Sequence, residues 1–200
     1  MNRFTFIMLS AAASALFSFS GATAQTPVPT EKTSDVVAQI QNGPWTSLSE
    51  TPLSGQTALY VFHSRTCGFC KAFKQSEKDS LLNAGIDLRF IPFPGSRENT
   101  NDVAYISFVR NRALFEDFDA RRRLDSPNIN ASPLYGEAYN STINSYTLMK
   151  SILSEAGQAV GTPLFVYQDT SDQWFVHAGY SSQGFAPVRA ALLERRRSQP

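Results

Sequence analysis

The stretch ALYVFHSRTCGFC, residues 58–70, decides how this chain folds. Its first six residues, 58–63, form an almost continuously apolar run, which is typical of a strand buried on both faces of a sheet. Cys67 and Cys70 then open a segment whose apolar residues recur at helical intervals as far as Leu82. The stretch therefore predicts a strand that leads directly into a helix, with two cysteines in the first turn of that helix.

The residues after this helix predict a parallel partner for the strand. Asn83-Ala84-Gly85 supplies a glycine stop for the helix, and residues 86–93 form a second apolar run. A strand, a helix and a second, parallel strand in this order predict a βαβ unit.

Residues 95–158 carry two helical patterns separated by a Pro-, Asn- and Ser-rich loop at 124–136. The first is marked by Val103, Ile106, Val109, Ala113 and Phe118. The second is marked by Ile143, Tyr146, Met149, Ile152, Leu153 and Ala156, with Asn140, Ser141 or Thr142 as its N-cap. These apolar residues are interpreted as core positions, and a groove for protein substrates is the alternative.

The remaining segments complete an α/β fold in which the helical insertion separates a βαβ half from a ββα half. Residues 164–167 and 174–177 predict two antiparallel strands, and residues 185–197 predict a final helix. Before the first strand, residues 25–56 form a leader that is flexible over 25–33. Within this leader, the sequence predicts a short helix at 36–41 and an edge strand at 45–53.

The N-terminal residues 1–24 have the pattern of a cleaved signal peptide. A positive start at Asn2-Arg3 is followed by the uncharged apolar run 4–19 and by Gly21-Ala22-Thr23-Ala24, a small-x-small site. An uncleaved membrane anchor is the alternative, but the run is short and rich in Ser and Ala for a span of about 20 apolar residues. The pattern predicts an exported protein without stable membrane insertion after cleavage.

The composition excludes some classes of partner. Hydrophobic residues make up 42% and charged residues 18%, which is typical of a globular domain. A formal net charge of +1 argues against a nucleic-acid partner bound by phosphate neutralisation. The triplets Arg121–Arg123 and Arg195–Arg197 are interpreted as solvated helix ends, with a partner-binding patch as the alternative.

Cys67 and Cys70 are the only cysteines, and their spacing favours a chemically reactive pair over a disulfide that stabilises the fold. A bridge that closes a four-residue loop removes little chain entropy. At a helix N-terminus, Cys67 is favoured as a thiolate that attacks disulfides, and Cys70 resolves the resulting mixed disulfide. The pair is thus the candidate catalytic, redox-active disulfide. Arg65, Lys71 and Lys74 either add positive potential there or are simply solvated.

The same C-x-x-C spacing also occurs in zinc sites. A structural zinc ion normally has four ligands, and only His63 and His177 remain as further soft candidates, without the usual paired-histidine spacing. We therefore expect no metal and no cofactor. His63 is interpreted as the end of a strand near the active site, with a proton-shuttle role as the alternative.

With these features together, the sequence resembles the thioredoxin superfamily, and most closely the catalytic domains of periplasmic DsbC/DsbG-type disulfide isomerases. The resemblance covers about residues 57–197. It is carried by residues 61–62, 66–71, 88–94, Gly161-Thr162-Pro163 and Gly179-Tyr180.

This resemblance implies a thioredoxin-like fold and a cis peptide at Thr162-Pro163 that faces the Cys67 sulfur. The loop would bind an extended substrate strand, and a redox partner would recycle the dithiol. The implied function is a periplasmic thiol–disulfide oxidoreductase, an isomerase or reductase of exported proteins that contain cysteines. A monomeric dithiol oxidase and a non-catalytic assembly chaperone of a secretion or conjugation system are the alternatives.

Two departures from the family pattern bear on these expectations. Thioredoxin has a buried acid at the position of Val61, where this chain is apolar as the isomerase-like branch is. The isomerases also have further cysteines and an N-terminal dimerisation domain, for which residues 25–56 are too short. We therefore do not expect their V-shaped dimer.

Overall fold

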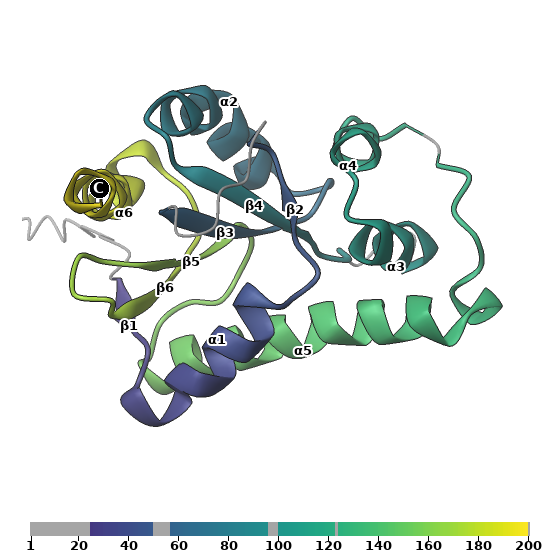
Figure 1. Cartoon of the computed structure of the whole chain (residues 1–200), viewed down its shortest axis with the longest axis horizontal. Coiled ribbons are helices and arrows are strands. Elements are labelled where there is room, and N and C mark those ends of the chain that lie inside the picture. The colour runs from purple at the N-terminus through teal and green to yellow at the C-terminus, as the bar shows by residue number, and fades with distance from the viewer. Residues whose placement is uncertain (1–24, 50–56, 96–99, 123, 200) are drawn as a thin grey trace, which may run out of the picture.

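The computed structural model describes residues 25–49, 57–95, 100–122 and 124–199 (Figure 1). The predicted signal peptide lies outside these residues, as does the end of the predicted edge strand. In chain order the elements are β1 (Thr26–Pro27), η1 (Thr30–Lys32), α1 (Thr33–Gln41), β2 (Thr46–Ser47), β3 (Ala58–His63), α2 (Gly68–Asn83), β4 (Asp87–Pro92), α3 (Thr100–Val109), α4 (Arg112–Asp119), η2 (Ile129–Ala131), α5 (Pro133–Glu155), β5 (Leu164–Gln168), β6 (Trp174–Ala178) and α6 (Ser182–Ser198).

The strands form one mixed sheet with the order β1-β6-β5-β3-β4-β2. β3 and β4 are parallel and are connected by α2, whereas β5 pairs antiparallel with both β3 and β6. A βαβ unit followed by two antiparallel strands and a helix is the thioredoxin-like arrangement. The predicted fold class is therefore confirmed, with the helical insertion lying between the two halves.

Helices cover both faces of this sheet, with α2 and α6 on one side and α1 and α5 on the other (Figure 1). β3 alternates between the two cores that result. Leu59 and Val61 pack into the core that contains Phe73 of α2, while Tyr60 and Phe62 face the core on the other side. Because β3 is buried on both faces, its sequence is apolar without alternation.

The prediction of one continuous helix in the first part of the insertion is wrong, because two helices, α3 and α4, occupy that segment. Arg110, between α3 and α4, has a left-handed backbone with φ 54°. The side chain of Asn111 then caps α4 by accepting a hydrogen bond from the N–H of Leu114 at 3.1 Å. An Asn side chain that bonds to the nearby backbone favours a new helix start over a continued helix.

The second insertion helix begins earlier than the sequence pattern indicates. α5 begins at Pro133 rather than near residues 140–142, and Ser132 caps it through a hydrogen bond from the N–H of Leu134 at 3.3 Å. Proline is well tolerated in the first turn of a helix, since its missing N–H would have no partner there. Pro133 therefore belongs to the helix and not to the loop.

The leader is more ordered than the sequence suggests. Residues 25–33 were expected to be flexible, yet Thr26 and Pro27 pair with β6 as an antiparallel edge strand. α1 contains the predicted helix, and β2 pairs with β4 at the opposite edge of the sheet. Among the residues described, none of the helices combines the length and the apolarity needed to cross a bilayer.

Candidate active site

The start of α2 places the first cysteine at a helix terminus, as the sequence predicts. Cys67 is the N-cap, with an extended backbone at φ −80° and ψ 114°. Its sulfur accepts a hydrogen bond from the N–H of Cys70 at 3.1 Å. The sulfur thus takes the position that a Ser or Asp oxygen has in ordinary N-caps, where an unpaired N–H favours an anion. The helix itself begins one residue later than predicted, at Gly68.

The two thiols, both free in this structure, have opposite environments. Cys67 is partly exposed, whereas Cys70 is fully buried. A hydrogen bond from the Cys70 thiol lowers the pKa of Cys67 to about 6; partial burial opposes this effect and the Cys70 N–H reinforces it. The same hydrogen bond and burial raise the pKa of Cys70. At neutral pH, Cys67 is therefore mostly a thiolate while Cys70 keeps its proton.

The loop before β5 lies against the reactive sulfur. The peptide bond between Thr162 and Pro163 is cis, and the Thr162 carbonyl oxygen lies 3.1 Å from the Cys67 sulfur, so that it accepts the thiol hydrogen when Cys67 is protonated. The N–H of Gly179 donates to the Pro163 carbonyl at 2.8 Å and so connects this loop to the end of β6. The predicted cis peptide and its position facing Cys67 are confirmed.

A charged cluster of three side chains lies beside the motif, and the sequence pattern points to His63 and Lys74 but not to Asp119. His63 is buried at the end of β3, and its Nε2 lies 2.6 Å from Asp119 Oδ1. The other oxygen of Asp119 accepts from Lys74 of α2. Burial alone would raise the pKa of Asp119, but the hydrogen bonds and charges of His63 and Lys74 outweigh it and lower the pKa to about 2. Because Asp119 is ionised, His63 donates from Nε2.

The insertion also supports the turn between β3 and α2. Arg65 forms an ion pair with Asp102 of α3 at 3.2 Å, and its guanidinium lies 4.9 Å from the centre of the Phe118 ring. Arg121, just after α4, donates to the Arg65 carbonyl at 3.2 Å. The insertion is therefore part of the active-site surroundings as well as a source of core residues.

The histidines considered as zinc ligands lie in separate environments. His63 contacts Asp119, whereas His177 on β6 is buried and stacks on Phe165 with ring centroids 5.9 Å apart. Burial lowers the pKa of His177. Within the described part of the chain, no three His, Cys, Asp or Glu side chains are grouped closely enough to share a metal ion.

Comparisons with known proteins find similarity only at the level of structure. No protein-family model matches the sequence, and no curated protein matches it significantly. Among solved structures, the catalytic domain of Proteus mirabilis ScsC aligns with 15% identity and a TM-score of 0.47, covering 81% of this chain and 97% of that one. The thiol-disulfide exchange protein alpha-DsbA2 from Wolbachia pipientis aligns with 17% identity and a TM-score of 0.44, covering 81% and 92%.

A DsbA variant from Pseudomonas aeruginosa is also similar, with 21% identity and a TM-score of 0.34 over 78% of this chain and 97% of that one. These similarities are remote. The fold assignment accordingly rests on the strand order and connections of the chain itself, and the chemistry rests on the geometry around Cys67.

Proposed function

We propose that this chain is a periplasmic thiol–disulfide oxidoreductase that acts on exported proteins containing cysteines. One observation carries the proposal: the Cys67 sulfur caps α2, its pKa is lowered to about 6, and a buried thiol lies one turn inside the helix. A low-pKa, accessible sulfur beside a second thiol is the arrangement that thiol–disulfide exchange requires.

The exchange proceeds in two balanced steps. The Cys67 thiolate attacks one sulfur of a client disulfide, so that the client S–S bond breaks, a mixed disulfide forms and the second client sulfur leaves as a thiolate. Cys70 then loses its proton and attacks the Cys67 sulfur, which releases the first client sulfur and leaves a Cys67–Cys70 disulfide. The client gains two electrons, and the reverse sequence oxidises a client dithiol.

The loop at Thr162 and Pro163 is the proposed binding site for the client backbone. Its contact with the Cys67 sulfur supports this role, because a client sulfur bonded to Cys67 must approach the same loop. Pairing through the main chain would accept many client sequences. Phe69, within the motif and 64% exposed, offers an apolar contact on the same surface.

The leading form of the proposal is a DsbC/DsbG-like isomerase or reductase, kept reduced by a dedicated redox partner. The alternative is a monomeric dithiol oxidase. The lowered pKa of Cys67 favours this alternative, because stabilising the thiolate stabilises the reduced pair and makes the disulfide more oxidising.

Trapping of mixed disulfides tests the exchange step through Cys67 that the isomerase, reductase and oxidase forms have in common. A Cys70→Ala variant should accumulate mixed disulfides through Cys67, since the step that releases the client is lost. Non-reducing gels and mass spectrometry would identify these adducts. The double variant Cys67→Ser/Cys70→Ala is the matched control and should trap nothing. An exported Cys70→Ala protein that forms no adducts would contradict the proposal.

The redox state in the cell separates the two forms. Rapid acid quenching and alkylation should find the Cys67–Cys70 pair mainly reduced for an isomerase or reductase, and mainly oxidised for an oxidase. A Cys67→Ser variant that fully retains function in the cell would instead support a non-catalytic assembly chaperone.

A further inference from the structure

A cationic groove of about 570 Å³ adjoins Cys67. It extends along α2 toward the end of α4, and Thr162 and Pro163 do not line it. Besides Cys67, its charged lining side chains are those of Arg65, Lys71, Lys74, Lys78, Asp79, Asp119 and Arg121. Five of these side chains are cationic and two are carboxylates.

The positive charge of the groove is only partly neutralised. Lys74 and Arg65 are paired with Asp119 and Asp102. Among the residues that the structure describes, Lys71 and Arg121 form no ion pair, and both are exposed. Lys71, and the Arg121 guanidinium apart from its hydrogen bond to the Arg65 carbonyl, are therefore available to an external anion in the groove that Cys67 also lines.

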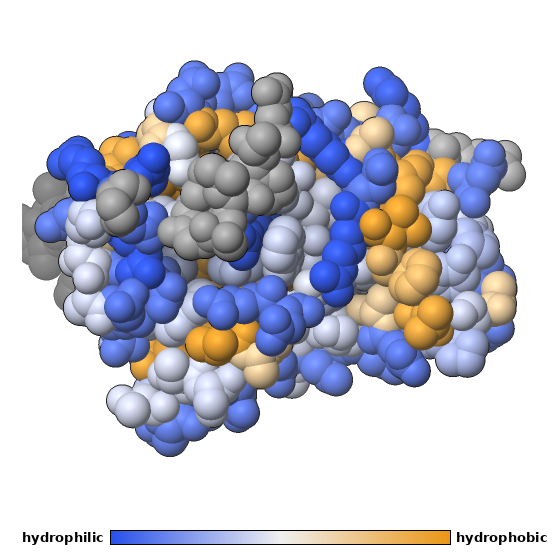
Figure 2. All heavy atoms as spheres, viewed as in Figure 1, coloured by the Kyte–Doolittle hydropathy of each residue, from blue (hydrophilic) through white to orange (hydrophobic). Residues whose placement is uncertain are grey.

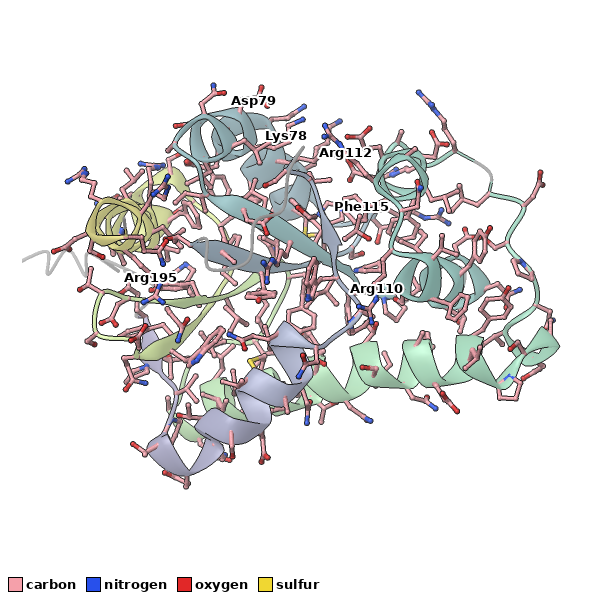
Figure 3. All side chains as sticks on the ribbon, in the orientation of Figure 1. Lys78, Asp79, Arg110, Arg112, Phe115 and Arg195 are labelled. Carbon is pink, nitrogen blue, oxygen red and sulfur yellow. The ribbon has the colours of Figure 1, made fainter. Side chains whose placement is uncertain are left out.

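Lys78 extends this charge along the helix. It lies 3.6 Å from Asp79, whose side chain is 86% exposed, so that water weakens this pair. Lys78 lies on the side of α2 that faces α4 (Figure 3). Figure 2 shows hydrophilic residues between α2 and α4 on the viewed face, in contrast to the hydrophobic residues that gather over α3 and α4.

The charge is local, since the whole chain has a formal net charge of only +1. A concave wall with an excess of one sign of charge concentrates the potential more than the same charges would on a flat surface. From Cys67 to Lys78, α2 rises about 16 Å. An extended peptide covers that length with about five residues.

We propose that the cationic groove binds acidic residues of the client polypeptide, within about five positions of the cysteine that Cys67 attacks. This inference rests on the proposed function and specifies its substrate class. The loop at Thr162 and Pro163 accepts the client backbone whatever its sequence, and the groove selects among clients by charge. Such long-range attraction acts mainly on the rate of association.

Three synthetic peptides test the proposal. Each contains a single cysteine, activated as a 2-pyridyl disulfide and flanked on both sides by two residues of glutamate, glutamine or lysine. The reduced full chain reacts with each peptide in a single turnover, and release of 2-thiopyridone gives the rate. The same peptides reacting with a neutral small thiol correct for differences in intrinsic reactivity.

We expect the glutamate peptide to react about fivefold faster than the glutamine peptide at about 0.01 M salt, since a few screened surface charges act together. The lysine peptide should be slower than both. The preference should weaken as the salt rises to about 0.15 M, where the Debye length falls from about 30 Å to about 8 Å.

Charge-reversal variants locate the effect. Lys71→Glu and Arg121→Glu should each bring the glutamate-to-glutamine ratio toward one, while any change in Cys67 acidity affects both peptides alike. Lys150→Glu is the matched control. It makes the same change of charge at an exposed site on α5, across the sheet from α2, and should preserve the ratio.

The outcomes distinguish a failure of the groove proposal from a failure of the proposed thiol–disulfide exchange function. Equal corrected rates for the three peptides, or a preference that survives both groove variants, would overturn the groove proposal while leaving disulfide exchange intact. If Cys67 reacts with none of the peptides, the proposed function is wrong and the groove proposal falls with it.

Discussion

The N-cap of α2 and the first turn of that helix each contain a cysteine, and the two cysteines differ in exposure and in pKa. Cys67 is partly exposed and its pKa is lowered, whereas Cys70 is fully buried and its pKa is raised. Only two residues separate them. The difference arises because the cap sulfur receives hydrogen bonds from the turn inside, while the sulfur of that turn donates one and has lost contact with water.

For these two cysteines, the pKa follows the position in α2 and the burial of each thiol rather than its neighbours in sequence. Phe69 and Phe73 repeat the pattern, since Phe69 is 64% exposed and Phe73 is fully buried. Cys67 and Phe69 are thus accessible to a partner, whereas the buried Cys70 and Phe73 pack α2 against the core.

The largest expected effect is on thiol reactivity. At pH 7 a thiol with a pKa of about 6 is mostly ionised, whereas a buried thiol with a raised pKa is almost entirely protonated. We expect iodoacetamide to alkylate Cys67 at least about 100-fold faster than Cys70 in the reduced protein. Limited alkylation followed by peptide mapping measures the ratio. Similar labelling of the two sites would remove the asymmetry on which the proposed function depends.

Truncating the two phenylalanines should give the next largest difference. Phe73 packs against the rings of Phe165, Phe185 and Tyr180, with centroids 4.8, 5.2 and 5.6 Å away. Phe73→Ala should lower the free energy of unfolding by about 3–5 kcal/mol. Phe69→Ala is the matched control and should change it by less than about 0.5 kcal/mol. Urea unfolding under reducing conditions measures both, and equal losses would contradict the burial difference.

The smallest expected effect is the pH dependence of stability. The pKa of Cys67 falls from an ordinary 9.0 to about 6 on folding, so the folded state binds fewer protons between these values. The reduced protein should therefore gain stability, relative to Cys67→Ser, as pH rises from about 6 to about 9. That gain is lost as pH falls through 6. Urea midpoints at pH 5.5 and 8.5 test this expectation, and a constant difference between the two proteins would refute it.

The βαβ half was predictable because its signals are local. The apolar run at Ala58–His63 has the bounds of β3, and the glycine stop ends α2 close to where it was predicted. The insertion was less predictable, although caps at Asn111 and Ser132 were present in the sequence. Neither cap stands out from the sequence pattern, because the apolar spacing continues past Asn111 and because Pro133 lies in a Pro-, Asn- and Ser-rich segment that predicts a loop.

Asp119 had no such signal. It follows His63 by 56 residues and lies in a helix whose pattern indicates only core packing. Its contact with His63 and Lys74 depends on how the insertion folds back over the start of α2. No local spacing encodes that contact, so the charged cluster beside the motif could not be predicted.

Local sequence patterns were enough to specify a strand, a helix, and a sulfur at the start of that helix with a second sulfur one turn inside. These features depend on hydrogen bonds and periodicities among residues that are close in the chain. The surroundings of the sulfur depend on long-range packing, which brings in the Thr162 carbonyl from 95 residues away and forms the cationic groove that Arg121 lines. Such contacts arise when the sheet and the insertion pack together, because burial brings together residues that the chain keeps far apart.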